Sequence, residues 1–176
     1  FTEYKSFKWP KCSGVFKRLS DCLANKGFTV ARHEVSPGVF IDIYNIHTDA
    51  GGHIKDKRAR FSQFQFLLEK MKDYSKGNAV IIAGDWNMFH EDGDDQVTFY
   101  LFLQRAGLRY MCRTEVCERE KFGRLDRVVY RSSGALSLEV TSVFFGEDSD
   151  FYDKDGIPLS DHMPLRVDFY WQKKVN

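Results

Sequence analysis

Residues 79–87 read Ala-Val-Ile-Ile-Ala-Gly-Asp-Trp-Asn. The first five form an unbroken apolar run, which is typical of a strand buried on both faces of a sheet. The run ends in Gly84-Asp85, so it predicts a strand that delivers a carboxylate to its end. If the chain stays extended, the side chain of Asn87 points the same way as that of Asp85. The pattern predicts a layered domain with polar groups held at a strand end.

The flanking segments predict the elements on either side of this strand. Residues 28–35 alternate like a half-buried strand, Pro37-Gly38 makes a turn, and residues 39–46 form a second strand, so a hairpin is expected. Apolar residues recur at three- and four-residue steps from Lys57 to Tyr74, which predicts a helix. Gly77 then ends that helix.

The rest of the chain continues this alternation of strands and helices. Asp94 is expected to cap a second helix that runs to about Ala106 and is closed by Gly107. Residues 1–26 are expected to be irregular. Further strands are predicted over residues 127–130, 136–145 and 165–171. The fold class is therefore α/β (α+β), and residues 1–176 are expected to form one domain.

Polar clusters at the ends of other predicted strands contain the candidate catalytic and metal-binding residues. Ser160-Asp161-His162 precedes the last strand and supplies a hard oxygen ligand beside an imidazole that titrates near neutral pH. Asp126 begins a strand, and its carboxylate can orient an imidazole. His47 ends the strand at 39–46 and can hydrogen-bond a phosphate. Convergence of such groups is what metal-assisted hydrolysis of a phosphate ester requires.

Each cluster also has a plain structural explanation when it is taken alone. Asp85 and Asn87 suit a turn or a cap, and Asp126 can pair with Arg127 at the surface. His33, His53 and His90 have no comparable neighbours and are expected in loops or on the surface. The acidic stretch at 90–95 and that at 147–155 do not match the spacing of an EF-hand and are expected to be solvated loops.

The composition excludes some classes of function. The 176 residues include 26 basic and 25 acidic side chains, so no global charge draws the chain to nucleic acid. The dense basic run at 55–60 is expected to be a solvated helix face. No apolar stretch is long enough to span a bilayer. The chain starts at Phe1 without a signal-peptide pattern, which we interpret as a processed or trimmed amino terminus.

Four cysteines permit three disulfide pairings. Their positions suggest Cys12–Cys22 and Cys112–Cys117, which would place the protein in an oxidising compartment and favours secretion. Zinc is the competing explanation, but neither cluster has the spacing of a zinc site. Free thiols are a third alternative.

The motifs together resemble those of the endonuclease/exonuclease/phosphatase superfamily, which includes deoxyribonuclease I-like enzymes and neutral sphingomyelinases. They stand in the family order between about residues 27 and 171. The segment 26–32 followed by 44–51 is most similar to the secreted, sphingomyelinase-like branch. The carrying motifs are Asn45-Ile46-His47, Gly84-Asp85-Trp86-Asn87, Leu125-Asp126-Arg127 and Ser160-Asp161-His162.

The resemblance implies a fold and a set of roles. The fold would be a two-layer β-sandwich flanked by helices. His162 would be the general base oriented by Asp126, and His47, Asn87 and Asn45 would contact the phosphate. Asp161, Asp85 and Asn87 would lie at a Mg²⁺ site, with Mn²⁺ as a substitute. Asp85 would bind the metal or position the attacking water.

One element of the family pattern is absent from this sequence. The family's first strands lead to a Gln-Glu pair whose Glu binds the metal, and this sequence contains no Gln-Glu pair. The resemblance therefore implies that the N-terminal part of the family domain is missing here, and that a cleaved N-terminal fragment of the same precursor is a possible partner.

Three functions are compatible with these observations. The first is a secreted Mg²⁺-dependent phosphodiesterase acting on sphingomyelin or a related phospholipid. The second is a deoxyribonuclease I-like nuclease. The third is a non-catalytic binding or toxin-like module that has lost part of the metal site.

Overall fold

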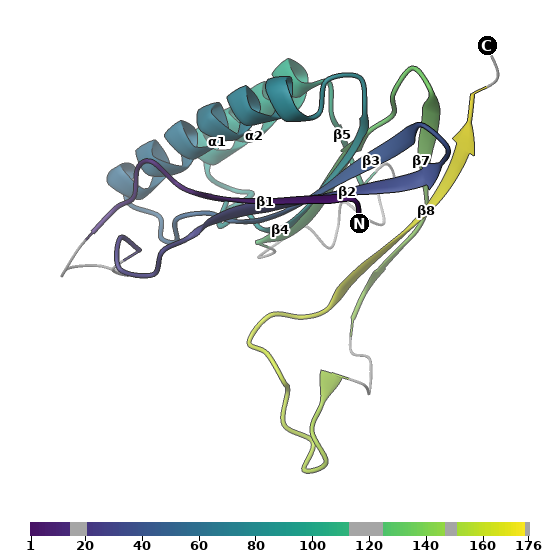
Figure 1. The fold of residues 1–176 in the computed structure, drawn as a ribbon. Helices are drawn as coiled ribbons and strands as arrows, with labels where there is room; N and C mark the ends of the chain where they lie inside the picture. Colours follow the sequence, from purple (N-terminus) through teal and green to yellow (C-terminus); the bar gives the residue numbers. More distant parts are fainter. Residues whose placement is uncertain (15–20, 113–124, 147–150, 175–176) are drawn as a thin grey trace.

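A computed structural model describes residues 1–14, 21–112, 125–146 and 151–174. Two β-sheets lie on one another, and two helices cover the outer face of the larger sheet (Figure 1). The order of layers is helices, six-stranded sheet and two-stranded sheet. This is the helix-flanked sandwich that the sequence predicts.

The larger sheet has the strand order β1-β2-β3-β4-β6-β5. Only the pairing of β3 with β4 is parallel, and the other four are antiparallel. The long helix that follows β3 makes the parallel crossover possible. The bounds are β1 Glu3–Lys8, β2 Gly27–Ser36, β3 Val39–His47, β4 Ala79–Asp85, β5 Arg109–Tyr110 and β6 Asp126–Arg131.

Two expectations about this sheet are corrected. Residues 1–26 are not wholly irregular, because β1 pairs with β2 over residues 3–8. The predicted irregularity rested on Pro10, Gly14 and the cysteines, all of which follow the strand. The short strand β5 was not predicted, since two residues show no periodicity. The hairpin of β2 and β3 is confirmed.

The two helices begin earlier than the sequence predicts. Helix α1 spans Ile54–Tyr74, and its N-cap is His53, whose imidazole accepts the amide of Lys55. His53 is therefore not a plain loop residue. Helix α2 spans Gly93–Ala106, and its cap is Asp92 rather than Asp94. The Asp92 carboxylate satisfies two free amides of the first turn.

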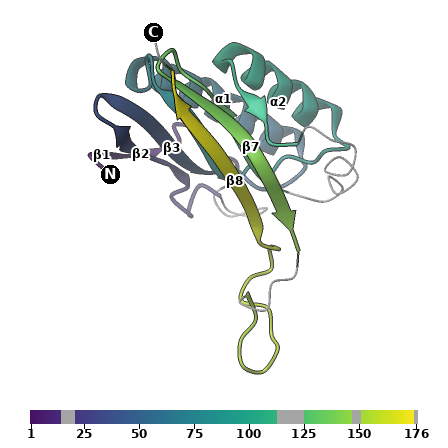
Figure 2. The same ribbon diagram turned by 90° about the vertical axis from the view of Figure 1, so that its right-hand side faces the viewer.

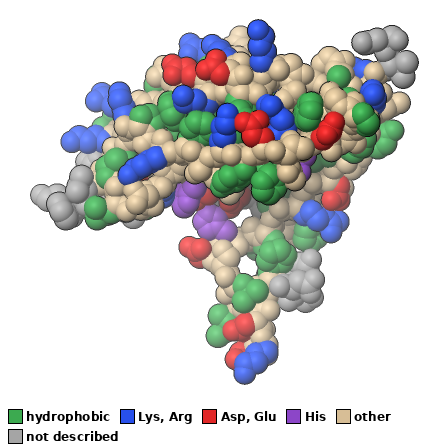
Figure 3. Space-filling view, in the orientation of Figure 1, with side chains coloured by type: hydrophobic (Ala, Val, Ile, Leu, Met, Phe, Trp, Pro, Cys, Tyr) green, Lys and Arg blue, Asp and Glu red, His purple; other side chains and the backbone are tan. Residues whose placement is uncertain are grey.

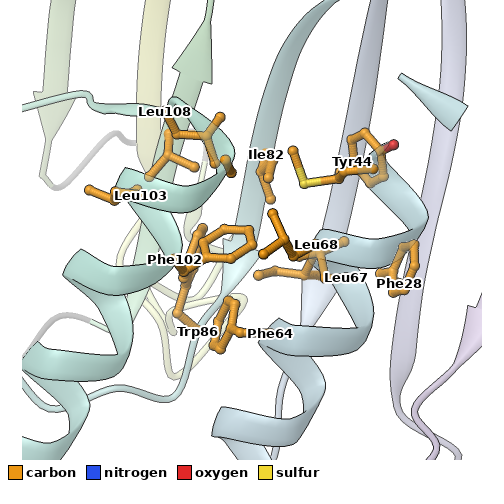
Figure 4. Packing of buried hydrophobic residues seen from close by; sticks show 14 of the residues in the cluster. Phe28, Tyr44, Phe64, Leu67, Leu68, Ile82, Trp86, Phe102, Leu103 and Leu108 are labelled. Carbon is orange, nitrogen blue, oxygen red and sulfur yellow. The ribbon is translucent and has the colours of Figure 1, made fainter. Parts of the chain in front are cut away.

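The main hydrophobic core lies between the helices and the larger sheet. Phe64, Leu67 and Leu68 of α1 meet Phe102 of α2 over Ile82 of β4 (Figure 4). Both helices pack on this face of the sheet, because their apolar positions at three- and four-residue spacing point to it.

A buried ion pair fixes the two helices to each other beside this core. Arg60 of α1 forms a two-pronged contact with Asp95 of α2, with Nη2–Oδ distances of 2.9 Å. Both side chains are almost fully buried. The expectation that the basic run at 55–60 and the acidic stretch at 90–95 are solvated is therefore wrong at these two positions. Their charges are offset by each other, which spacing in the sequence does not reveal.

The second sheet consists of β7, Leu136–Phe145, and β8, Leu165–Lys173. Its inner face packs on Tyr130 and Ile41 of the larger sheet through Leu136 and Leu138. The described residues before β8, 151–164, extend away from the body as an arm (Figure 2). No helix in the described ranges is long and apolar enough to cross a membrane.

Candidate active site

Three of the predicted site residues form a row across adjacent strands. His47 at the end of β3 pairs in register with Asp85 at the end of β4, and Asp85 pairs with Asp126 at the start of β6. Neighbouring strands lie about 4.8 Å apart, so the row is about 10 Å long. The parallel β3–β4 pair and the antiparallel β4–β6 pair bring two strand ends and one strand start to the same edge.

His162 reaches this row from the arm. Its Nδ1 lies 2.5 Å from Oδ2 of Asp126. A carboxylate accepts only, so Nδ1 carries a proton, and in the neutral form of the imidazole Nε2 is then the proton acceptor. The hydrogen bond to Asp126 raises the pKa of His162, and the charges of Asp126, Asp85 and Asp161 raise it further against the opposing effect of burial.

The pKa of His47 is shifted in the opposite direction from that of His162. Burial and the ammonium of Lys26 lower its pKa, outweighing the carboxylate of Asp85. Its Nε2 lies 3.4 Å from Oδ2 of Asp85. The backbone is fixed as well, because the indole of Trp9 donates to the carbonyl of His47 at 2.8 Å. The site thus holds one imidazole biased towards the neutral form and another biased towards the charged form.

Asn87 is placed differently from the expectation of an extended chain. Its φ is 46°, so the backbone turns after Asp85 instead of continuing as a strand. Its amide group donates to Oδ2 of Asp85 at 2.9 Å and to the carbonyl of Thr48 at 3.1 Å. Both amide protons are engaged in this arrangement. Asn87 therefore holds Asp85 in place, and its contact with a phosphate stays a prediction.

The end of β4 is held by two neighbours of Asp85. Gly84 has a φ of 134°, and a Cβ there would lie 2.1 Å from the carbonyl oxygen of Ile46, so only glycine permits this approach of β4 to β3. Trp86 is fully buried against Phe64, and its indole donates to the carbonyl of Arg127 at 3.0 Å. The apolar core is thereby joined directly to the row of polar groups.

The row opens into a hollow of about 500 Å³ on the sheet face opposite the helices. His47, Asp85, Asp126 and Asn45 line it, together with residues of β1 and β2. Asn45 lies two residues before His47 and on the same face, as the alternation of a strand requires. Histidine and acidic side chains gather where the arm leaves the body (Figure 3).

The candidate metal ligands do not form a complete site. Among the described residues no three His, Cys, Asp or Glu side chains are grouped as a metal cluster. Asp85 is engaged with Asn87, while Asp161 is exposed beside His162. These oxygens have the chemistry that Mg²⁺ prefers, but they supply only part of a coordination sphere. The assignments to Asp161, Asp85 and Asn87 therefore stay predictions.

Sequence reasoning missed three residues around His47. Thr48 is fully buried and donates its amide to the carbonyl of Asp85 at 3.1 Å and its hydroxyl to the carbonyl of Trp86 at 2.5 Å. Lys26 and Trp9 contact the same turn from distant parts of the chain. Their positions next to Gly27 and Pro10 gave no signal of this, since only tertiary structure brings them to the site.

Comparison with known proteins supports the fold. The chain is similar to the chain called sphingomyelinase of Mycobacterium tuberculosis, with 29% identity over 180 residues that cover 93% of this chain. The matched region covers 33% of that relative, so the present chain spans about one third of its length. No family model matches the chain.

Two solved structures share the arrangement of strands and helices. One is D. rerio TDP2 complexed with a single-strand DNA product, with a TM-score of 0.67, 19% identity, and coverage of 97% of this chain and 68% of that one. The other is an endonuclease/exonuclease/phosphatase from Bacteroides vulgatus, with a TM-score of 0.65, 15% identity, and coverage of 97% and 66%. The chain has the endonuclease/exonuclease/phosphatase fold. This deoxyribonuclease I-like fold places the row of His47, Asp85 and Asp126 at one edge of its larger sheet.

Proposed function

We propose that this protein is a phosphodiesterase that hydrolyses its substrate by attack of water on phosphorus. The observation that carries the proposal is the 2.5 Å contact between His162 and Asp126 at the edge of a polar hollow. A carboxylate that orients an imidazole and leaves its second nitrogen unprotonated is the arrangement of a general base. The likeness to sphingomyelinases supports the same class of reaction.

In the proposed step, the water oxygen forms a bond to phosphorus and its proton passes to Nε2 of His162. The imidazolium that results is stabilised by the carboxylate of Asp126. The bond from phosphorus to the leaving oxygen breaks, and that oxygen takes up a proton from solvent. His47 and Asn45 lie on the same sheet face as Asp85 and are proposed to hydrogen-bond the phosphate oxygens.

A divalent cation is part of this proposal, although the described residues supply an incomplete site. Mg²⁺ is commonly held by one or two carboxylates together with a substrate phosphate. Asp85 and Asp161 are the proposed ligands, with Mn²⁺ as a substitute. When bound, the cation would offset the negative charge around the phosphate.

Replacing Asp126 by asparagine is expected to lower kcat by at least about 10²-fold, the lower end of what general-base catalysis contributes, since the imidazole loses the partner that orients it. The pKa of His162 should fall towards its ordinary value, because its hydrogen bond with Asp126 is the largest cause of the increase. A general base must be neutral, so activity rises with pH through this pKa. The acid limb of kcat/KM should therefore move to lower pH in the variant.

This expectation is checked by pH–rate profiles alongside NMR titration of the His162 imidazole in EDTA. The variant should also lose folding stability at low pH, where the raised pKa of His162 stabilises the wild type. A raised pKa in the folded state stabilises the wild type fully below the unfolded value, and this contribution is lost as the pH rises through the folded value. An unchanged pKa of His162 in the variant would contradict the proposed pairing.

The proposed substrate is sphingomyelin or a related phospholipid. The arm beside His162 carries exposed apolar side chains, among them Phe151, Ile157, Leu159 and Met163. Exposed apolar groups carried on one projecting segment indicate contact with an apolar partner, and a lipid surface is one. A nuclease is the second candidate, favoured by the fold shared with the DNA-bound TDP2 structure.

Replacing Ile157 and Leu159 together by serine is expected to lower hydrolysis of sphingomyelin vesicles about tenfold, because the side chains lose apolar surface that transfers to lipid. Hydrolysis of the soluble diester bis(p-nitrophenyl) phosphate should stay within about twofold, since neither residue lies in the row of the site. Val97→Ser is the matched control, because Val97 and Ile157 are both 60% exposed but Val97 lies on α2.

Parallel assays of the wild type on vesicles and on plasmid DNA separate the first two functions. Preference for DNA, with no effect of the arm substitutions, would favour the nuclease. Activity on none of the substrates would favour the non-catalytic module.

In this proposal the protein is secreted and associates with another fragment of its own precursor. The disulfide between Cys12 and Cys22 is present, as expected from the sequence, and disulfides persist in oxidising compartments. Cys112 is also disulfide-bonded, while Cys117, its predicted partner, lies outside the described residues. The second sheet contains only β7 and β8 among the described residues, so each strand has an unpaired edge, and the proposed partner for such an edge is an N-terminal fragment of the same precursor.

A further inference from the structure

The two residues that flank the Cys12–Cys22 disulfide both bind the turn that follows His47. The amide of Ser13, next to Cys12, donates to Oδ2 of Asp49 at 2.5 Å. The carboxylate of Asp21, next to Cys22, accepts the amide of Ala50 at 2.9 Å. The turn, residues 47–51, is thus held at two successive residues by the two sides of one covalent bridge.

A buried cation extends this contact towards His47. Nζ of Lys26 lies 2.6 Å from Oδ1 of Asp21 and donates to the carbonyl of Thr48 at 3.0 Å. Both side chains of this ion pair are largely hidden from solvent. A buried charge needs a fixed partner, so any displacement of Asp21 also displaces Lys26.

Thr48 connects Lys26 to the row of polar groups through backbone hydrogen bonds. Its carbonyl is shared by Lys26 and by the amide of Asn87, whose other contact is Asp85. Its own amide donates to the carbonyl of Asp85. His47 is the adjacent residue, and its imidazole points to Asp85.

We propose that the Cys12–Cys22 disulfide is a positioning clamp, which acts through Ser13, Asp21 and Lys26 to fix the location of His47 against Asp85. The kinetic part of the test rests on the proposed function, because it measures hydrolysis of a phosphodiester. None of the clamp residues reacts. They restrict the turn together with Gln63 and Arg60 of α1, so loss of the bridge gives back only part of its conformational freedom.

The test compares three folded variants with the wild type. In Cys12→Ser/Cys22→Ser the bridge is absent, and in Lys26→Met the link from Asp21 to Thr48 is absent. Lys57→Met is the matched control, because Lys57 forms a similar ion pair with Asp92 that touches the start of α2 instead of the turn. A reductant is unsuitable, since it would also open the disulfide of Cys112.

Two readouts are measured for each protein. We expect kcat to fall about tenfold in the bridge and Lys26 variants with KM within about twofold, because a displaced group costs rate more than binding. The His47 resonance in a ¹H–¹³C spectrum of histidine-labelled protein is assigned with His47→Gln and recorded at a pH at which His47 is neutral in every variant, because Lys26 also acts on its pKa. It should shift or broaden. The His162 resonance should stay unchanged, since its partner Asp126 is outside the clamp.

The outcomes separate this inference from the proposed function. An unchanged His47 resonance in the folded bridge variant would overturn the clamp, whatever the activity. If the wild type hydrolyses none of the substrates, the proposed function fails, and the resonance still decides on the clamp. If the bridge variant does not fold, Lys26→Met decides in its place, and a wild-type His47 resonance there counts against the clamp.

Discussion

Replacing His162 by alanine is expected to lower kcat by about 10³-fold while the fold is retained. General bases contribute about 10² to 10⁴ in rate, and no second imidazole in the described residues contacts Asp126, the carboxylate that binds His162. His47 does not substitute for it, because its nearest carboxylate is Asp85 in the neighbouring strand. The residual rate comes from groups that bind and orient the phosphate.

Steady-state kinetics on the best substrate of the wild type check this result, with thermal unfolding to show that the variant is folded. His33→Ala is the matched control, because His33 lies within β2 and pairs with Ile41 away from the row. KM should change little, since His162 acts in the chemical step. Turnover close to that of the wild type would exclude His162 as the base.

Removal of divalent metal by EDTA is expected to reduce hydrolysis to background, and Mg²⁺ to restore it. Asp85, Asp126 and Asp161 all act on His162, so the site presents several carboxylates to an anionic substrate. A phosphodiester within ~4 Å of a single carboxylate is repelled by about 4 kcal/mol at an effective dielectric constant of about 20. The proposed cation would offset this repulsion.

The measurement is an activity assay in EDTA followed by titration with Mg²⁺ and then with Mn²⁺. Because the described residues supply few ligands, calorimetry of the substrate-free protein should show weak Mg²⁺ binding, with a Kd of ~1 mM. Asp161→Asn should raise the Mg²⁺ concentration needed for half-maximal rate. Full activity in EDTA would exclude the cation from the reaction.

The strands and helices that are long and periodic were predictable from the sequence. The run at 79–83 forms β4, and the alternation at 136–145 forms β7 with the expected bounds. Gly107 ends α2 in the left-handed conformation, as its position after the last apolar residue indicated. These features depend on local pattern, which a single sequence contains.

The contacts that place the site residues were less predictable. The approach of His162 to Asp126 joins the arm to the start of β6, and only the motif order suggested it. The turn at Asn87 departs from the extended form because its amide bonds to Thr48 and Asp85 are made across strands. Likewise Lys26 reads as an ordinary surface lysine, although Asp21 and Thr48 enclose it. Such contacts depend on long-range packing.

The proposed general base and the carboxylate that contacts it come from different layers of the molecule. Asp126 begins a strand of the larger sheet, whereas His162 precedes a strand of the smaller one. The dyad is therefore assembled only when the two sheets have docked in the correct register. We therefore expect a chain whose two sheets have not yet docked to lack the proposed hydrolysis, because His162 and Asp126 meet only in the docked form.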